Sequence, residues 1–134
     1  MPVETAVIIR PLAHTDSISA LTDLLHRAYA ELAEQGLHFM QRLRELQARH
    51  TVIGEVRGRG LMIGMELVTD AATKTPAKEL CEKVIGRAFQ NGLLLLSCGV
   101  STLRFMPPLL VSRQQVDEAV TLLEASLVEA LASR

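Results

Sequence analysis

The stretch that decides the fold is VIGEVRGRGLMIGMELV, residues 52–68. Val52–Val56 and Leu61–Val68 are rich in β-branched and large apolar residues, which are typical of strands. Between them the chain reads Arg-Gly-Arg-Gly, and two glycines in four residues are typical of a tight reversal of the backbone. The pattern predicts two neighbouring strands of one sheet.

On both sides of this pair, extended and helical patterns alternate. Further strands are predicted at 5–10, 93–96 and 102–106, and helices at 17–34, 37–49, 75–90 and 113–131. The resulting order is β-α-α-β-β-α-β-β-α. Adjacent strand pairs separated by helices indicate an α+β fold, with a mostly antiparallel sheet covered by helices.

Four signals set the helix boundaries. Gly36 is expected to end the first helix in a left-handed position. Thr75–Pro76 is expected to open the third helix, with the hydroxyl as cap and proline at the first helical position, and Asn91–Gly92 to stop it. Ser112 and Gln115 have the spacing of a capping box, which predicts the start of the last helix.

Length and composition exclude several classes of function. The 134 residues suit a single domain, residues 1–134, and 49% apolar residues suffice for a core. Fourteen basic against fifteen acidic residues give no field that would attract a nucleic acid, and 3% aromatic residues argue against a base-stacking surface. No apolar run approaches the roughly 20 residues of a membrane span. Without a secretory signal, Cys81 and Cys98 are expected to be reduced, mostly buried thiols of a cytoplasmic protein.

The glycine-rich segment is the first candidate site. Arg57, Gly58, Arg59 and Gly60 could form a nest of backbone N–H groups for a phosphate, with two guanidinium groups beside it. The alternative is a tight connection between strands. Phosphate cradles of the P-loop or Rossmann type need a helix directly after the glycines, whereas the residues that follow here resemble a strand.

Arg104 is the second candidate. It lies within an extended apolar segment just before two prolines, so it either faces solvent or is held for a carboxylate ligand. Lys74, Lys78 and Lys83 are expected to be solvated, because a Schiff-base amine needs a desolvated pocket. No metal-ligand spacing is present among the His, Asp and Glu residues.

Several segments together resemble the C-terminal small domain of class III pyridoxal-phosphate aminotransferases. The resemblance covers about residues 33–132 and rests on RLRELQ (42–47), residues 52–68, 75–96 and 113–131, and LRFMPPL (103–109). In that family the arginine of the last motif contacts the substrate carboxylate, and Arg104 matches it. The Schiff-base lysine, the aspartate on the pyridine nitrogen and the phosphate loop of that family belong to a large domain outside this chain. The resemblance therefore implies no autonomous catalysis and no cofactor bound by this chain alone.

The first part, about residues 5–40, resembles the start of GNAT-type N-acetyltransferases. The similarity rests on AVIIRPLAHTD (6–16), on the leucine pattern of residues 21–29 and on GLHF (36–39). The acetyl-coenzyme A loop of that family is nearly matched by residues 57–62, but Met62 occupies a position that needs a small residue. Two such resemblances in one chain suggest a natural or engineered chimera.

In this interpretation the helix at 17–34 acts as a lid. Its apolar residues would cover the aminotransferase-like sheet, which would otherwise be an aggregation hazard: Leu21, Leu24, Leu25, Ala28 and Leu32. The leading hypothesis is thus a folded domain without catalysis. The alternatives are an acetyl-coenzyme A-dependent acetyltransferase fragment and an interaction module that forms homodimers through residual apolar surface.

Overall fold

The computed structural model describes residues 18–133, which form an α+β domain as predicted. The elements are α1 (Ile18–Arg49), β1 (Ile53–Arg59), β2 (Met62–Asp70), β3 (Thr75–Pro76), α2 (Lys78–Gln90), β4 (Leu96–Cys98), β5 (Thr102–Phe105) and α3 (Arg113–Ala132). The predicted strand at 5–10 lies outside the described residues. None of the helices within residues 18–133 combines the length and apolar character of a membrane span.

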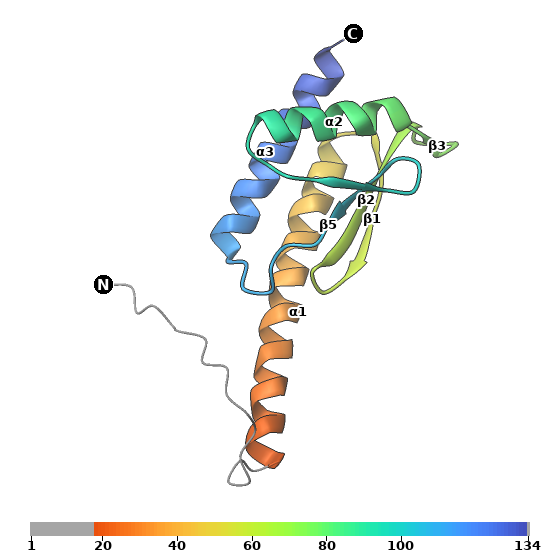
Figure 1. Ribbon diagram of the computed structural model, residues 1–134. Coiled ribbons are helices and arrows are strands. Elements are labelled where there is room, and N and C mark those ends of the chain that lie inside the picture. Colours follow the sequence, from red (N-terminus) through yellow and green to blue (C-terminus); the bar gives the residue numbers. More distant parts are fainter. Residues whose placement is uncertain (1–17, 134) are drawn as a thin grey trace.

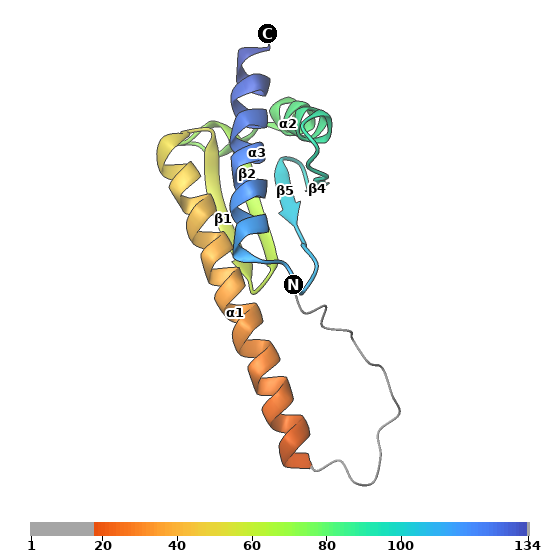
Figure 2. The same cartoon turned by 90° about the vertical axis from the view of Figure 1, so that its left-hand side faces the viewer.

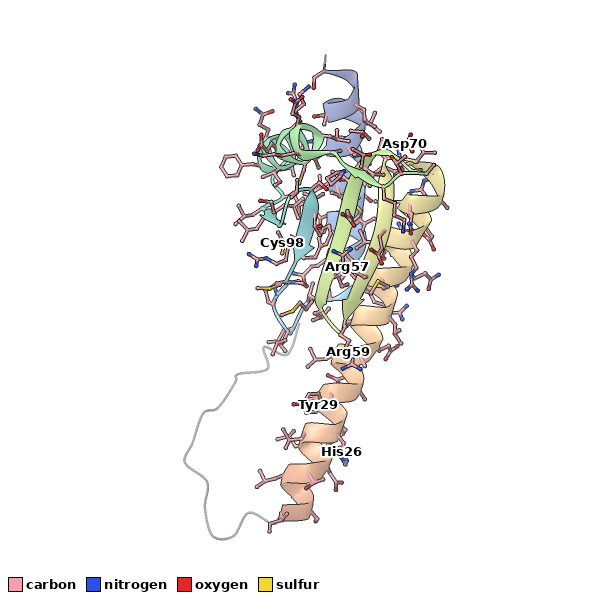
Figure 3. The ribbon with its side chains drawn as sticks, turned by 90° about the vertical axis from the view of Figure 1, so that its right-hand side faces the viewer. His26, Tyr29, Arg57, Arg59, Asp70 and Cys98 are labelled. Carbon is pink, nitrogen blue, oxygen red and sulfur yellow. The ribbon has the colours of Figure 1, made fainter. Side chains whose placement is uncertain are left out.

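The sheet has the strand order β1-β2-β5-β4, with β3 paired to β2, and every pairing is antiparallel. α1 and α3 run side by side along one face of this sheet, and α2 lies across one end (Figures 1 and 2). Figure 3 looks onto the opposite face, which no helix covers. The molecule thus has one buried and one open sheet face.

The core lies between the sheet and the helices. Alternate strand residues point to one face, so every second side chain of β2 and β5 enters the core. The residues that are at most 1% exposed include Ile63, Met65, Leu67 and Leu103 of the sheet, and Leu43, Leu46, Val84, Leu123 and Leu127 of the helices. This single apolar cluster joins all three helices to the sheet.

The β1–β2 hairpin is longer than predicted, because the strand continues through the glycine-rich segment. Arg57, Gly58 and Arg59 pair with residues of β2, and only Gly60 and Leu61 form the turn. Gly60 has a φ of +53°, which glycine adopts without strain. A Cβ on Gly58 would lie 2.3 Å from the Met62 carbonyl oxygen, so this glycine serves the close approach of the two strands.

The predicted helix break at Gly36 is wrong: α1 is continuous from Ile18 to Arg49. Gly36 is buried against the hairpin turn, and a Cβ there would lie 2.3 Å from the carbonyl oxygen of Gly60. Glycine is thus required at this position by close packing between α1 and the turn, and not by a change of backbone direction.

The expectation that residues 17–34 form a lid over the sheet is also wrong for the part that the structure describes. The first half of α1 projects past the end of the sheet (Figures 1 and 2). Leu24, Leu25 and Ala28 are exposed, and Leu21 and Leu32 are only partly buried. The helical spacing of these residues correctly predicted a helix, but it does not specify what the apolar side covers.

Other boundaries differ by a few residues. Thr75–Pro76 pairs with β2 as β3 and does not open a helix; α2 begins at Lys78, with Ala77 as N-cap. The strand predicted at 93–96 is found at Leu96–Cys98. Asn91 ends α2 as predicted, and the capping box of Ser112 and Gln115 at the start of α3 is confirmed by both of its hydrogen bonds.

Charged side chains join α1 to α3. Asp117 accepts one hydrogen bond from Nε of Arg42 and pairs with Nε2 of His38, each at 2.9 Å. Seven residues further along α3, Glu124 accepts two hydrogen bonds from Arg49 and lies 2.9 Å from Nε2 of His50. These partners could not be predicted from the sequence, because the paired residues lie 74–79 positions apart and share no local pattern.

Candidate functional site

The open face of the sheet carries the polar and exposed side chains of alternate strand positions. Arg57 and Cys98 are labelled on this face in Figure 3. In the register of the sheet, Arg57 lies opposite Gly64, Gly64 opposite Arg104, and Arg104 opposite Leu96. One row across the sheet thus contains two arginines, separated by a glycine.

Arg104 has no carboxylate partner among residues 18–133. In β5, the two neighbours of Arg104, Leu103 and Phe105, point into the core and are buried. Arg104 points to the other face of the sheet and is partly exposed. Gly64 has no side chain to fill the space on one side of it. The sheet thus fixes the backbone of Arg104, and the guanidinium is open to a ligand.

Large apolar side chains lie near Arg104 on the open face of the sheet. Leu96 lies in the adjacent register position, and continuing the same register by two residues brings Leu94 opposite Met106. Met62 precedes Ile63, which pairs with Phe105, so Met62 also lies beside Met106. All four are well exposed, at 56–77%. We refer to Met62, Leu94, Leu96 and Met106 as the apolar rim of Arg104.

A hollow of about 270 Å³ adjoins the rim, lined by Arg104 together with Leu93, Leu94, Phe105, Met106, Pro107, Pro108 and residues of α1 and α3. A larger hollow of about 620 Å³ lies far from Arg104, between the start of α2 and the end of α3. Two lysines line it: Lys83 donates a hydrogen bond to the carbonyl oxygen of Ser133, and Lys78 lies 3.9 Å from Glu82. The smaller hollow combines an apolar wall with a cation, Arg104, that has no ion-pair partner within residues 18–133.

The predicted anion-binding turn has a different geometry from the expected nest. Residues 57–59 are paired with β2 in the sheet, so their backbone groups face that strand and not a ligand. Arg57 forms ion pairs with Glu55 at 2.9 Å and with Glu66 at 3.3 Å, whereas Arg59 is exposed. This geometry favours the strand connection, and anion binding at residues 57–60 stays a prediction.

The three lysines of the chain do not fit the cofactor that the resemblance implies. Lys74, Lys78 and Lys83 are all exposed, and Lys78 lies 3.9 Å from Glu82. A lysine that forms a Schiff base needs a desolvated setting. None of these lysines therefore fits the role of the residue that holds pyridoxal phosphate, and no reaction step on this cofactor is assigned to the chain.

The two cysteines differ in their surroundings. Cys81 is buried in α2, and burial raises the pKa of its thiol. Cys98 is exposed at the end of β4, so the expectation of two buried thiols holds for one of them. Within residues 18–133, no three His, Cys, Asp or Glu side chains are grouped for a metal ion.

Comparison with known proteins places the chain in a family. The model of the class-III aminotransferase family matches residues 9–127. The chain belongs to this family. The match begins at residue 9 and so covers nearly all of the segment that resembles an acetyltransferase. Nothing in the comparisons supports an acetyltransferase segment or a chimera.

The class III relatives are much longer than this chain. It is 37% identical over 115 residues to an isoleucine 2-epimerase from Lentilactobacillus buchneri, covering 85% of this chain and 26% of the relative. It is 32% identical over 124 residues to a leucine/methionine racemase from Thermococcus litoralis, covering 92% and 28%. A solved transaminase with L-alanine superposes with a TM-score of 0.73 at 38% identity, covering 87% and 27%. The chain thus spans about a quarter of the length of these relatives.

Proposed function

We propose that this chain is the part of a class III pyridoxal-phosphate enzyme that binds the carboxylate of an amino-acid substrate, and that Arg104 is the residue that binds it. The observation that carries the proposal is the unpaired guanidinium of Arg104 on the open sheet face. A guanidinium donates two parallel hydrogen bonds to a carboxylate, which fixes the orientation of the ligand as well as its position.

The substrate class follows from the surroundings of Arg104. The apolar rim offers no hydrogen-bond partner for a charged or amide side chain, and its exposed apolar surface would be covered by an apolar side chain of the ligand. We therefore propose α-amino acids with apolar side chains as substrates. The names of two relatives, an isoleucine epimerase and a leucine/methionine racemase, agree with this substrate class.

The chain's contribution is binding and orientation. The cofactor and the lysine that holds it would come from the remaining three quarters of a class III enzyme, which this chain does not include. An acetyltransferase activity is not proposed, because the backbone of residues 57–59 is paired in the β1–β2 ladder.

A hybrid enzyme tests this function. The chain replaces the matching quarter of the Thermococcus litoralis racemase, and kcat/KM is measured for leucine, methionine and alanine. Arg104→Gln is expected to lower kcat/KM by about 10- to 100-fold, the range for a lost hydrogen bond to a charged group. Arg57→Gln is the matched control, because Arg57 lies in the same row of the sheet but is already paired with two glutamates.

The rim is tested in the same hybrid. Met106→Ser is expected to lower the preference for leucine over alanine by about tenfold, the value of a few methylene contacts, and to leave alanine turnover unchanged. Equal losses for Arg104→Gln and Arg57→Gln would contradict carboxylate binding by Arg104. An unchanged leucine preference in Met106→Ser would contradict the substrate class alone.

A further inference from the structure

The first half of α1 carries a heptad pattern that the fold of one chain does not use. Its apolar residues are spaced alternately by three and four positions, at Ile18, Leu21, Leu25, Ala28 and Leu32. This spacing is the a/d pattern of helices that pair along their length. We refer to these five residues as the α1 stripe.

The α1 stripe continues the core face of the same helix. Phe39 follows Leu32 by seven positions, and it is buried in the core together with Leu43 and Leu46. Beyond the sheet the same side of α1 is only partly covered by the described residues: Ile18 is 83% and Leu25 56% exposed, whereas Leu21 and Leu32 are partly buried. Residues 18–35 extend over about 27 Å at 1.5 Å per residue, and an uncovered helix of this length is marginal in water.

We propose that the α1 stripe pairs, in antiparallel orientation, with the α1 stripe of a second copy of this chain. In one register of the two helices, each pair of facing residues joins an a position of the heptad to a d position. Ile18 then meets Gln35, Leu21 meets Leu32, and Leu25 meets Ala28. The small Ala28 opposite the large Leu25 fills the centre without a clash. The arrangement is self-complementary, as a twofold dimer requires.

The position of the rest of the molecule selects the antiparallel orientation. The sheet and α3 lie on one side of α1 (Figure 2). The stripe faces this side as well, because it continues the heptad spacing of the buried Phe39. Two parallel copies would place both bodies in the space between the helices, whereas antiparallel copies place them at opposite ends. The flanking pairs set Leu24 beside Glu31 and Thr22 beside Tyr29, so like charges do not face each other.

The antiparallel dimer also covers a second exposed area. The loop that precedes α3 lies at the end of the body from which α1 projects (Figures 1 and 2). It exposes Leu109 at 68% and Leu110 at 85%. The start of the second copy's α1 would lie beneath this loop.

The apolar area buried between the two copies determines how stable the dimer is expected to be. Leu24 and Tyr29 flank the stripe and are 58% and 68% exposed. With the four large residues of the stripe they make six side chains per copy: the four exposed ones can bury roughly 100 Å² each, and the partly buried Leu21 and Leu32 roughly half as much. The total of roughly 1,000 Å² for both copies is in the range of weak, transient interfaces. We therefore expect a reversible dimer that dissociates on dilution. This inference concerns the 134-residue chain by itself and does not rest on the proposed function.

Sedimentation equilibrium of the full chain between about 10 μM and 1 mM tests the dimer. The wild-type chain is expected to change from monomer to dimer in this range, and Leu25→Glu to stay monomeric. Ala30→Glu is the matched control: it adds the same charge on the opposite side of the same helix turn and is expected to dimerise normally. Because both positions are exposed, neither change disturbs the core.

Spin labels test the orientation. In a Cys98→Ser background, labels are attached at His26→Cys or at Glu34→Cys, and the distance between copies is measured by pulsed electron paramagnetic resonance. The antiparallel register separates residues 34 of the two copies by about 22 Å along the helix axis, but residues 26 by almost nothing. Equal distances at both positions would overturn the antiparallel arrangement.

Two results would overturn the dimer itself. One is a wild-type chain that stays monomeric at about 1 mM, which would mean that another part of a longer family chain is what covers the stripe. The other is a dimer that Leu25→Glu and Ala30→Glu weaken equally, which would place the contact elsewhere.

Discussion

At Gly36, a single hydrogen atom in place of a side chain allows α1 to touch the hairpin turn. The nearest atoms to a Cβ at this position all belong to the backbone of Gly60, at 2.3–2.7 Å. Backbone atoms cannot move away as the end of a flexible side chain can. The contact therefore links two glycines that lie 24 positions apart, one in a helix and one in a turn with positive φ.

We predict that Gly36→Ala destabilises the fold. Alanine favours a helix over glycine by up to about 1 kcal/mol, but displacing the hairpin costs about 1–3 kcal/mol, as in other overpacked sites. Urea unfolding should therefore show a net loss. Gly86→Ala is the control, because Gly86 lies in α2 with no atom within 4 Å of its Cβ position, and it should gain stability. A Gly36→Ala chain as stable as the wild type would contradict the close contact.

At the scale of elements, α1 and α3 are held together by apolar packing and by two acidic residues of α3. The hydrogen bond from Arg49 is the main cause that lowers the pKa of Glu124, and the hydrogen bond with His50 adds to it. The pKa of Glu124 in the folded chain thus lies below its value in the unfolded chain. A carboxylate with a lowered pKa stabilises the fold above its unfolded pKa, and this contribution is lost as the pH falls through the folded pKa.

We predict that the free energy of unfolding decreases as the pH is lowered below about 4.3, the ordinary pKa of a glutamate. Glu124→Gln should make this decrease shallower, by no more than about 1 kcal/mol because the pair is partly exposed. Glu118→Gln serves as control, since Glu118 is exposed on the same helix. Identical pH profiles for both variants, measured by urea unfolding, would exclude a role for Glu124.

At the scale of the whole molecule, the compact body begins well inside α1. The core cluster starts at Phe39, and the residues before Gly36 contribute no buried side chain among those described. The part of α1 that extends beyond the sheet therefore adds length and exposed apolar surface, and not stability of the monomer. This differs from the lid that the sequence pattern suggested.

We predict that a chain starting at Ala33 unfolds at nearly the same urea concentration as the full chain, with a change below about 1 kcal/mol, typical of surface changes. The measurement is made below about 10 μM so that association between copies does not contribute. The shortened chain should also remain monomeric at high concentration. A large loss of stability in dilute solution would show that the removed residues do cover the core.

The sequence alone predicted those features that depend on neighbouring residues. The β-branched and apolar residues on both sides of the glycine-rich segment 57–60 predicted the pair of strands β1 and β2. The spacing of Ser112 and Gln115 predicted the start of α3, and the resemblance of LRFMPPL made Arg104 the candidate for carboxylate binding. Each depends on a local preference of the backbone or on a motif within ten to twenty residues.

The tertiary structure alone decided which distant residues meet. It turned Gly36 from a helix end into a contact with Gly60, paired Arg57 with Glu55 and Glu66, and left Arg104 unpaired beside Gly64. The reason is that helical or strand spacing specifies which side of an element is apolar, but not what that side packs against. Only the register of the sheet and the position of α1 relative to it decide where the apolar surface is buried and where it remains open to a partner.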